Sequence, residues 1–284
     1  MLTAQNKTAL ITGASFGIGM EFARIFAREG YNLVFVARNG DRLRQLASEL
    51  EKAHGTRSLI LATDLTEPGA PAYVLDQTTR ADIQVDVLVN NAGFAVAGFV
   101  EDLKLEEIRL QFETNFFGTV ALTKAVLPAM RAQRSGHIIM VSSVSGLHGS
   151  PIVSSYSASK HALEGWSESL RLEVGSLGIK VALVEPGSYE TDIWTRNAHL
   201  GERVSDPNSP NLARSQRMGE AVRKLKKRDP IQVARLIARI ALDPNPRLRY
   251  LIGTDARVQM LFKSVLPWKW HEKLVSRALG LDQA

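Results

Sequence analysis

Hydrophobic and polar positions alternate in two different ways along this chain of 284 residues. Short apolar runs rich in β-branched residues, such as Val87, Leu88 and Val89, are hydrophobic on both faces, which is typical of strands buried between two helical layers. These runs predict strands at 8–12, 32–37, 58–62, 85–90, 137–142, 180–185 and 250–253. Longer stretches with a helical period predict helices at 17–29, 41–54, 106–134, 157–177 and 229–242. The repeated alternation predicts an α/β fold with one doubly wound parallel sheet and helices on both faces.

Two segments depart from this alternation. Residues 189–218 are polar, lack clean periodicity and follow the sixth expected strand, where a doubly wound sheet has its ligand crevice. We therefore expect one domain over residues 1–255 that includes a substrate loop at about 189–228. Residues 256–284 form an amphipathic extension of that domain, in which Pro267 interrupts the pattern and predicts two short helices. We expect these helices to pack on their own subunit or a neighbouring one, in preference to a peripheral membrane contact.

Composition excludes several classes of chemistry. The absence of cysteine excludes disulfides, iron–sulfur clusters and thiol catalysis, and the six histidines show no metal-ligand spacing, so we expect no metal site. We expect a cytoplasmic protein, because no run of 18 apolar residues is present and the N-terminal residues are polar. The net charge of +6 is concentrated in residues 214–249, which hold 11 basic and 3 acidic side chains. No aromatic residue interleaves with the basic run at 223–228, so we expect a solvated helix surface and no nucleic-acid partner.

A glycine-rich turn follows the first expected strand and leads directly into the first expected helix. Such a turn binds anions, because free backbone N–H groups and the helix dipole face the ligand and glycine lets the backbone approach it. Strand, turn and helix in this order predict a dinucleotide pyrophosphate site. The residues expected to contact the dinucleotide are Gly13, Ser15, Phe16, Gly17, Ile18 and Gly19.

The end of the second expected strand indicates which dinucleotide binds. An acidic residue there would hydrogen-bond a ribose 2′-hydroxyl, whereas an arginine accommodates a 2′-phosphate. The position holds Arg38 and no acidic residue, so we expect NADP(H) in preference to NAD(H). Asp41 lies close by and is interpreted as the N-cap of the next helix. Asp64 and Leu65, at the end of the third strand, are expected beside the adenine, although a lone aspartate equally caps a turn.

Four further residues are candidates for catalysis. Tyr156 and Lys160 are spaced to share one face of a helix, and a nearby ammonium turns a tyrosine of ordinary pKa about 10 into an acid–base catalyst. Ser143, at the end of the fifth strand, is placed to hydrogen-bond a carbonyl oxygen. Asn115 stands inside an expected helix, where asparagine is unfavourable and requires a reason such as a kink, a water or a backbone bond.

In their order and spacing these motifs resemble the short-chain dehydrogenase/reductase family in its single-domain form. The resemblance covers about residues 7–192, and loosely the chain to Gly253. It rests on Thr12-Gly13-x-x-x-Gly17-x-Gly19, Asn90-Asn91-Ala92-Gly93, Asn115, Ser143, Tyr156-x-x-x-Lys160 and Pro186-Gly187-x-x-x-Thr191. It implies a Rossmann fold with the sheet order 3-2-1-4-5-6-7, and a homodimer or homotetramer formed through the helices near 106–134 and 157–177.

The resemblance also implies roles for the residues. Tyr156 would be the acid/base, Ser143 would polarise the carbonyl, Lys160 would lower the tyrosine pKa and hold the nicotinamide ribose, and Asn115 would hold a water. Beyond the glycine turn and the adenine site, the implied cofactor-binding residues are Asn91, Ala92, Gly93, Tyr156, Lys160, Pro186, Gly187 and Thr191. Neither Ser15 nor Phe16 is basic, unlike many NADP-preferring members, so Arg38 supports that preference nearly alone.

The leading hypothesis is an NADP(H)-dependent oxidoreductase that interconverts a ketone or aldehyde and an alcohol. The extension past the seventh strand resembles a subgroup that acts on steroids, retinoids and long-chain ketones, so we expect an apolar or bulky substrate. The candidate substrate contacts are Ser143, His148, Tyr189 and Trp194. The alternative is a non-catalytic nucleotide-binding scaffold or regulatory protein of the same fold, against which the complete set of four catalytic residues argues.

Overall fold

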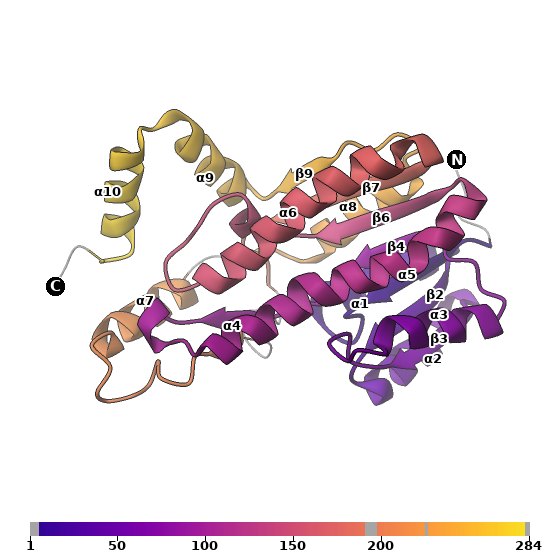
Figure 1. Ribbon diagram of the computed structural model, residues 1–284, viewed down its shortest axis with the longest axis horizontal. Helices are drawn as coiled ribbons and strands as arrows, with labels where there is room; N and C mark the ends of the chain where they lie inside the picture. The colour runs from indigo at the N-terminus through magenta and orange to yellow at the C-terminus, as the bar shows by residue number, and fades with distance from the viewer. Residues whose placement is uncertain (1–5, 191–197, 225–226, 282–284) are drawn as a thin grey trace.

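The computed structural model describes residues 6–190, 198–224 and 227–281, and its centre is a parallel sheet of seven strands (Figure 1). The sheet order is β3-β2-β1-β4-β6-β7-β9, which confirms the expected order once the two short strands outside this sheet are left out of the count. Its strands are β1 (Thr8–Thr12), β2 (Asn32–Ala37), β3 (Ser58–Ala62), β4 (Val87–Asn90), β6 (Gly136–Val141), β7 (Ile179–Pro186) and β9 (Arg249–Ile252). The order reverses between β1 and β4, and a ligand crevice opens at such a switch point, at the carboxyl ends of the strands.

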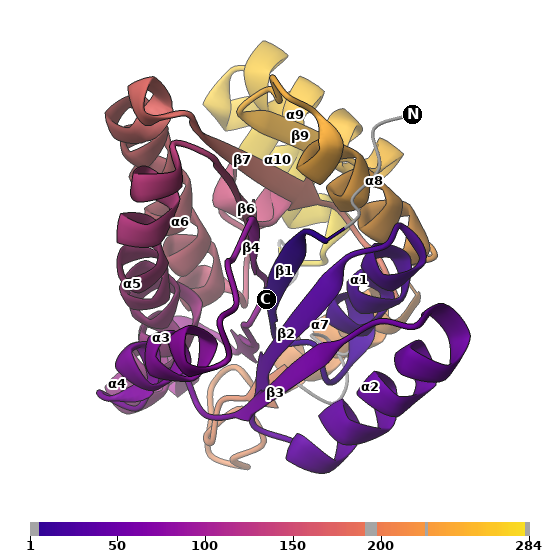
Figure 2. The same cartoon turned by 90° about the vertical axis from the view of Figure 1, so that its right-hand side faces the viewer.

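Two layers of helices cover the sheet, one on each face (Figure 2). One layer consists of α1 (Gly17–Arg28), α2 (Gly40–His54) and α8 (Ile231–Leu242). The other consists of α3 (Ala70–Arg80), α5 (Gly118–Gln133) and α6 (Ser154–Val174). Consecutive residues of β1 point to opposite layers, because Ile11 packs in the core under α1 whereas Leu10 packs in the core under α5. This two-sided burial explains why the strands are apolar at nearly every position.

The expected helix at 106–134 is three consecutive pieces. α4 (Leu105–Phe112) is followed by a π-helical turn at Glu113–Phe117, which continues directly into α5. Short 3₁₀ turns lie at Val100–Asp102, Val144–Gly146 and Gly175–Leu177.

The sequence pattern missed four elements. They are α3, α7 (Leu212–Lys224), which lies inside the expected substrate loop, and the paired short strands β5 (Ala95–Ala97) and β8 (Ala198–Leu200).

The C-terminal extension is an arm that rises away from the sheet (Figure 1). It contains α9 (Thr254–Val265) and α10 (Trp268–Ala278), which confirms two short helices on either side of Pro267. The arm packs little on its own chain, because α9 buries only Ala256 and α10 buries no residue, both helices lying wholly in the described chain; packing on a neighbouring subunit, the other expected surface, stays a prediction. Its exposed large apolar side chains are Val258, Leu261, Phe262, Val265, Trp268, Trp270 and Leu274. No helix in the described ranges has the length and apolar character needed to cross a membrane.

Candidate functional site

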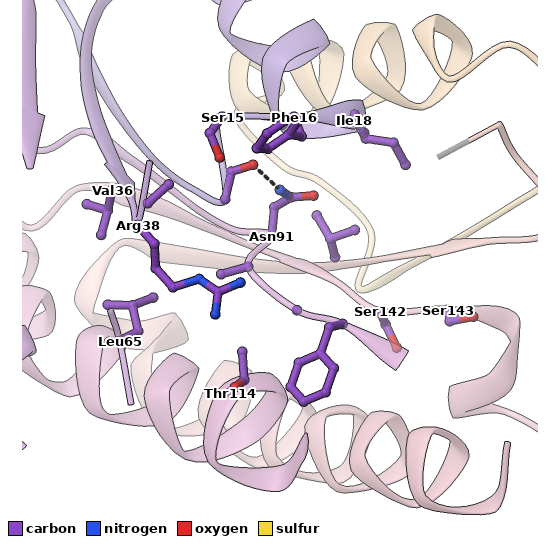
Figure 3. Close-up of a pocket in the computed structure, with 18 of the residues that line it drawn as sticks. Ser15, Phe16, Ile18, Val36, Arg38, Leu65, Asn91, Thr114, Ser142 and Ser143 are labelled. Carbon is purple, nitrogen blue, oxygen red and sulfur yellow. Dashed lines mark hydrogen bonds between the residues drawn. The ribbon is translucent and has the colours of Figure 1, made fainter. Parts of the chain in front are cut away.

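A cavity of about 370 Å³ lies at the carboxyl ends of the sheet strands (Figure 3). The segments that follow β1, β2, β3, β4, β6 and β7 all contribute to its lining, as expected for a topological switch point. The expected site residues that line it are Gly13, Ser15, Phe16, Gly17, Ile18, Gly19, Arg38, Asp64, Leu65, Asn91, Ala92, Gly93, Ser143, Tyr156, Lys160, Pro186, Gly187 and Tyr189. Thr191 and Trp194 lie outside the described residues.

The glycine loop has the form of a phosphate cradle. α1 begins at Gly17, and its N-cap residue Phe16 makes no side-chain capping hydrogen bond among the described residues, so the N–H groups of the first turn remain available to a ligand. Gly13 adopts a φ of +68°, which L side chains rarely take, and a Cβ at Gly19 would overlap the carbonyl oxygen of Gly13. The loop therefore accepts only glycine at these two places, and it fits a dinucleotide pyrophosphate.

Asn91 holds this loop against the end of β4. Its side-chain amide donates to the carbonyl oxygens of Thr12, at 3.0 Å, and Gly13, at 3.3 Å. The Thr12 hydroxyl in turn accepts hydrogen bonds from the backbone N–H groups of Asn91 and Ala92, each at 2.9 Å. The neighbouring Asn90 is buried in the core and donates to the Thr123 hydroxyl at 2.9 Å. Of these two consecutive asparagines, Asn91 therefore lines the cavity and Asn90 stabilises the core.

Arg38 reaches into the cavity from the end of β2, between Leu65 and Asn91 (Figure 3). Its side chain is 75% exposed and lies 3.8 Å from a carboxylate oxygen of Asp64. That carboxylate also accepts hydrogen bonds from the backbone N–H and the hydroxyl of Thr66, so Asp64 caps a turn as well as lining the cavity. Arg38 thus places a guanidinium at the end of the cavity where the adenosine ribose of a dinucleotide is expected, and a single carboxylate lies beside it.

The interpretation of Asp41 as a helix N-cap is wrong. α2 begins at Gly40, and the N-cap is Asn39, whose side-chain oxygen accepts from the backbone N–H of Arg42 at 3.0 Å. Asp41 lies in the first turn, where it pairs with Arg44 at 2.6 Å and interacts favourably with the positive end of the helix dipole. Asp41 is therefore occupied away from the Arg38 guanidinium, as the interpretation of Arg38 as a phosphate ligand requires.

Ser143, Tyr156 and Lys160 meet at the end of the cavity formed by β6 and α6. Burial raises the pKa of Tyr156 to about 12, although its hydrogen bond with Ser143 lowers it. The Lys160 ammonium lies 5.8 Å from the centre of the Tyr156 ring and donates to the carbonyl oxygen of Val141 at 2.8 Å. Burial lowers the pKa of Lys160 to about 8, although the carboxylate of Glu164 raises it. In the protein alone, the group that lowers the tyrosine pKa is therefore Ser143, and Lys160 supplies a buried charge one helical turn away.

Asn115 occupies the π-helical turn between α4 and α5, where the widened backbone places its buried amide against the loop after β4. Its side-chain oxygen accepts from the N–H of Phe94, and its nitrogen donates to the Phe94 carbonyl oxygen, each at 3.0 Å. The nitrogen also lies 3.1 Å from the hydroxyl oxygen of Ser159 on α6. Asn115 does not line the cavity directly, and its backbone bonds are one of the reasons for a mid-helix asparagine that the sequence suggested.

Asp255, which the sequence analysis missed, ties the turn after β7 to the arm. Its carboxylate accepts from the backbone N–H of Ser188 at 2.6 Å and pairs with Arg228. Arg228 is the last residue of the expected substrate loop, and its backbone pairs with Tyr189 at the start of that loop. A Cβ at Gly187 would lie 2.6 Å from this carboxylate, so the Pro186-Gly187 turn packs directly on Asp255. An aspartate in the first turn of a helix gives no sequence signal for such a long-range contact.

The histidine that lines the cavity is His199, whereas the sequence analysis named His148 as a candidate substrate contact. His148 is not among the residues that line the cavity; its ring bonds to the side chain of Gln259 on α9 at 2.9 Å. His199, which carried no expected function, lines the cavity and packs edge-on against Phe94 at 5.1 Å between ring centroids. The pairing of β5 with β8 brings His199 there, and strands of three residues leave no periodic signal in a sequence.

Tyr189 lines the cavity and is 2% exposed. Its hydroxyl has no hydrogen-bond partner among the described residues, and burial raises its pKa. A buried unpaired hydroxyl is costly, so its position in the cavity wall is consistent with the expected contact to a polar group of a substrate.

Comparison with known proteins agrees with this geometry. The family model described as short chain dehydrogenase matches residues 7–200. The chain belongs to the short-chain dehydrogenase/reductase family. Members of this family are oxidoreductases, and the chain is accordingly an oxidoreductase of the same family.

Three relatives illustrate the range of this family. The chain is 40% identical to the uncharacterised oxidoreductase YusZ of Bacillus subtilis, over 96% of this chain and 98% of that protein. It is 35% identical to the 3-ketodihydrosphingosine reductase of Bacteroides thetaiotaomicron, over 93% of each. A short-chain dehydrogenase of Sphingobium yanoikuyae, solved in complex with NADPH, superimposes with a TM-score of 0.71 at 30% identity, over 91% of this chain and 93% of that one.

In the part of the chain that the structure describes, no group of three or more histidine, aspartate or glutamate side chains is arranged to hold a metal ion.

Proposed function

We propose that this protein is an NADP(H)-dependent oxidoreductase that interconverts a ketone or aldehyde and an alcohol. The observation that carries the proposal is the grouping of Ser143, Tyr156 and Lys160 in the same cavity as the glycine loop. In Figure 3, Ser143 lies across the cavity from Arg38, so an extended dinucleotide would span from the phosphate-binding end to the reacting end.

The roles follow from the chemistry of these groups. A nicotinamide nucleotide bound in the cavity would supply or accept the hydride. Ser143 hydrogen-bonds the carbonyl oxygen, and the Tyr156 phenol donates a proton to that oxygen in reduction and takes it back in oxidation. Lys160 stabilises the phenolate electrostatically, because an ammonium in a buried site acts through a low effective dielectric. Asn115 supports this end of the cavity by fixing the Phe94 backbone.

The preference for NADP(H) rests on this chain's own Arg38. Its guanidinium enters the cavity beside Asp64, and Asp41, the acidic residue next to it in sequence, is paired with Arg44. Arginine binds a phosphate with two parallel hydrogen bonds, and a ribose hydroxyl cannot accept such a pair.

The substrate is proposed to be an apolar or bulky carbonyl compound. Phe94, Tyr189 and His199 form a partly aromatic wall, and aromatic rings bind apolar groups while the Tyr189 hydroxyl remains to bind a polar one. One relative is a 3-ketodihydrosphingosine reductase, so long-chain ketones are the first substrates to assay, followed by steroids and retinoids.

The protein is also proposed to form a homo-oligomer through α4, α5 and α6. Leu110, Phe117 and Leu172 are 51%, 50% and 84% exposed on or between these helices. Large apolar side chains exposed on neighbouring helices indicate a surface that a partner subunit covers.

The test of the proposed function is the Tyr156→Phe variant in a carbonyl panel with NADPH. Phenylalanine keeps the ring packing and removes the transferable proton, so kcat falls at least ~10²-fold. Binding of NADPH, followed by fluorescence, changes little. Tyr73→Phe, at a half-exposed position on α3, is the control and retains full activity. Near-normal turnover of Tyr156→Phe contradicts the assignment, and a wild-type protein that binds NADPH but reduces nothing in the panel supports the non-catalytic scaffold instead.

A further inference from the structure

Behind the catalytic end of the cavity lies a buried group of charges that the proposed reaction does not use. Glu164 on α6 and Glu185 on β7 are 4% and 1% exposed, and neither lines the cavity. The guanidinium of Arg249 on β9 pairs with Glu164, with Glu185 at 2.9 Å and with Glu168 at 2.6 Å. One cation thus faces three carboxylates, of which two are buried and Glu168 is half exposed.

Of the two deeply buried carboxyl groups, Glu185 has a raised pKa. Burial raises the pKa of Glu185 to about 7, Arg249 lowers it, and the neighbouring Glu164 raises it further. Glu185 therefore tends to hold a proton near neutral pH, and Glu164 keeps its ion pair with Arg249.

Glu164 stands one helical turn after Lys160, and both side chains are 4% exposed. Residues four apart on a helix are neighbours, and Glu164 is the group that raises the Lys160 pKa against its burial. Tyr156, one turn before Lys160, is neutral at physiological pH because burial raises its pKa. The Lys160 charge is thus opposed by burial and supported by Glu164.

A second buried polar group lies beside Glu164. One Glu164 carboxylate oxygen and the Ser142 hydroxyl are both buried with no hydrogen-bond partner among the described residues. A Cβ at Gly146 would lie 2.8 Å from that hydroxyl and 3.2 Å from that oxygen, so both atoms pack closely around Gly146 and leave no room for a side chain there. An unpartnered carboxylate oxygen costs stability, and an apolar residue in place of a buried ion pair is often more stable. Glu164 thus joins α6 to β9 through Arg249, while one of its carboxylate oxygens is bonded by no described residue.

We propose that Glu164 is a positioning residue that keeps the Lys160 amine charged, while Arg249 and Glu185 hold its carboxylate in place. The inference rests on the proposed function, because Glu164 would affect the reaction only through Lys160. A charged Lys160 stabilises the Tyr156 phenolate, so loss of the Glu164 charge weakens the acid–base pair on the alkaline side of neutrality.

The test compares Glu164→Gln with Glu168→Gln in carbonyl reduction between pH 6 and pH 10. Both changes remove one carboxylate from the same Arg249 on the same helix, but Glu168 is 52% exposed at its side chain and lies a further turn from Lys160. In Glu164→Gln the alkaline limb of the kcat profile moves to lower pH by about one unit, the low end for an opposite charge close by. KM for the carbonyl compound changes less than twofold, and Glu168→Gln follows the wild type.

Two further measurements keep the inference falsifiable. Glu164→Asp retains the charge, so its alkaline limb returns close to that of the wild type; a limb displaced equally in Glu164→Asp and Glu164→Gln means that only packing matters and overturns the inference. Unchanged profiles in Glu164→Gln overturn it as well. Titration of the Lys160 side chain by ¹³C NMR, assigned with Lys160→Met, needs no turnover, and here Glu164→Gln lowers the Lys160 pKa. If the wild type reduces no substrate the proposed function fails, while this titration still decides whether Glu164 holds the Lys160 charge.

Discussion

At the scale of single residues, we expect Arg38 to decide the choice of cofactor. In Arg38→Ala, affinity for NADPH falls about ten- to hundredfold, because a hydrogen bond to a charged group contributes roughly 1.5–3 kcal/mol, while affinity for NADH is unchanged. Fluorescence titration with both nucleotides measures this. Arg80→Ala is the matched control, since Arg80 on α3 is 74% exposed and pairs with Asp76, and neither residue lines the cavity. Equal losses for the two nucleotides, or a wild-type preference for NADH, contradict the prediction.

The residues show which parts of the site a sequence can reveal. The glycine loop, Arg38, Ser143, Tyr156 and Lys160 follow strand ends or share a helical period, so local order alone places them at one crevice. His199 and Asp255 reach the site through contacts between distant segments, which no local pattern encodes. Asn39 and Asp41 both suit an N-cap, and only the backbone at the helix start distinguishes them.

At the scale of elements, Asp255 joins β7, the base of the loop and α9. In Asp255→Asn the free energy of unfolding at pH 7 falls by about 1.5–3 kcal/mol, the range for hydrogen bonds to a charged group, and KM for the carbonyl compound rises more than kcat changes. Chemical denaturation and initial-rate kinetics measure the two effects. The control is Asp41→Asn, whose side chain is 92% exposed and whose ion pair contributes little.

The same contact gives a pH dependence. Burial raises the pKa of Asp255, but the hydrogen bonds from Ser188 and the charge of Arg228 outweigh it and leave the pKa below its ordinary value. A folded-state pKa below the unfolded one stabilises the protein above the unfolded pKa, and this stabilisation is lost as the pH falls through the folded pKa. The stability difference between wild type and Asp255→Asn is therefore full at pH 7 and shrinks below about pH 4. A difference that stays constant down to pH 3 means that Asp255 acts through packing alone.

Elements also mark the limits of pattern reading. The π-helical turn at Glu113–Phe117 interrupts a helix without changing its apolar faces, so the sequence predicts one continuous helix there. α7 lies in a polar segment that lacks a clean apolar stripe, and its helix was missed for that reason. The sheet strands were found because burial on both faces makes them apolar throughout.

At the scale of the whole molecule, the doubly wound sheet follows from the chain pattern, because strand–helix alternation and right-handed crossovers leave few arrangements. The position of the arm does not follow, since its exposed apolar residues need a surface that the described part of one chain does not provide. The surface around α4 is suited to it: Leu105 and Leu110 are exposed, and Glu106 and Glu113 offer charges opposite to the lysines of α10. We therefore expect the arm to pack on α4 of a second copy.

Removal of α10 tests this expectation. A chain that ends after Leu266 keeps α9 and its contacts from Gln259 to His148 and from Lys263 to the Leu147 carbonyl, so NADPH binding persists. Its oligomer is expected to dissociate at tenfold or higher protein concentration than the full chain, as measured by analytical ultracentrifugation, because the buried apolar area of a large side chain contributes about 1.5–3 kcal/mol. The double change Trp268→Gln with Trp270→Gln, which preserves the helix, should act in the same direction. An unchanged oligomer in both variants contradicts the packing, and binding of the full chain to anionic vesicles that is lost with α10 would assign the arm to a membrane surface.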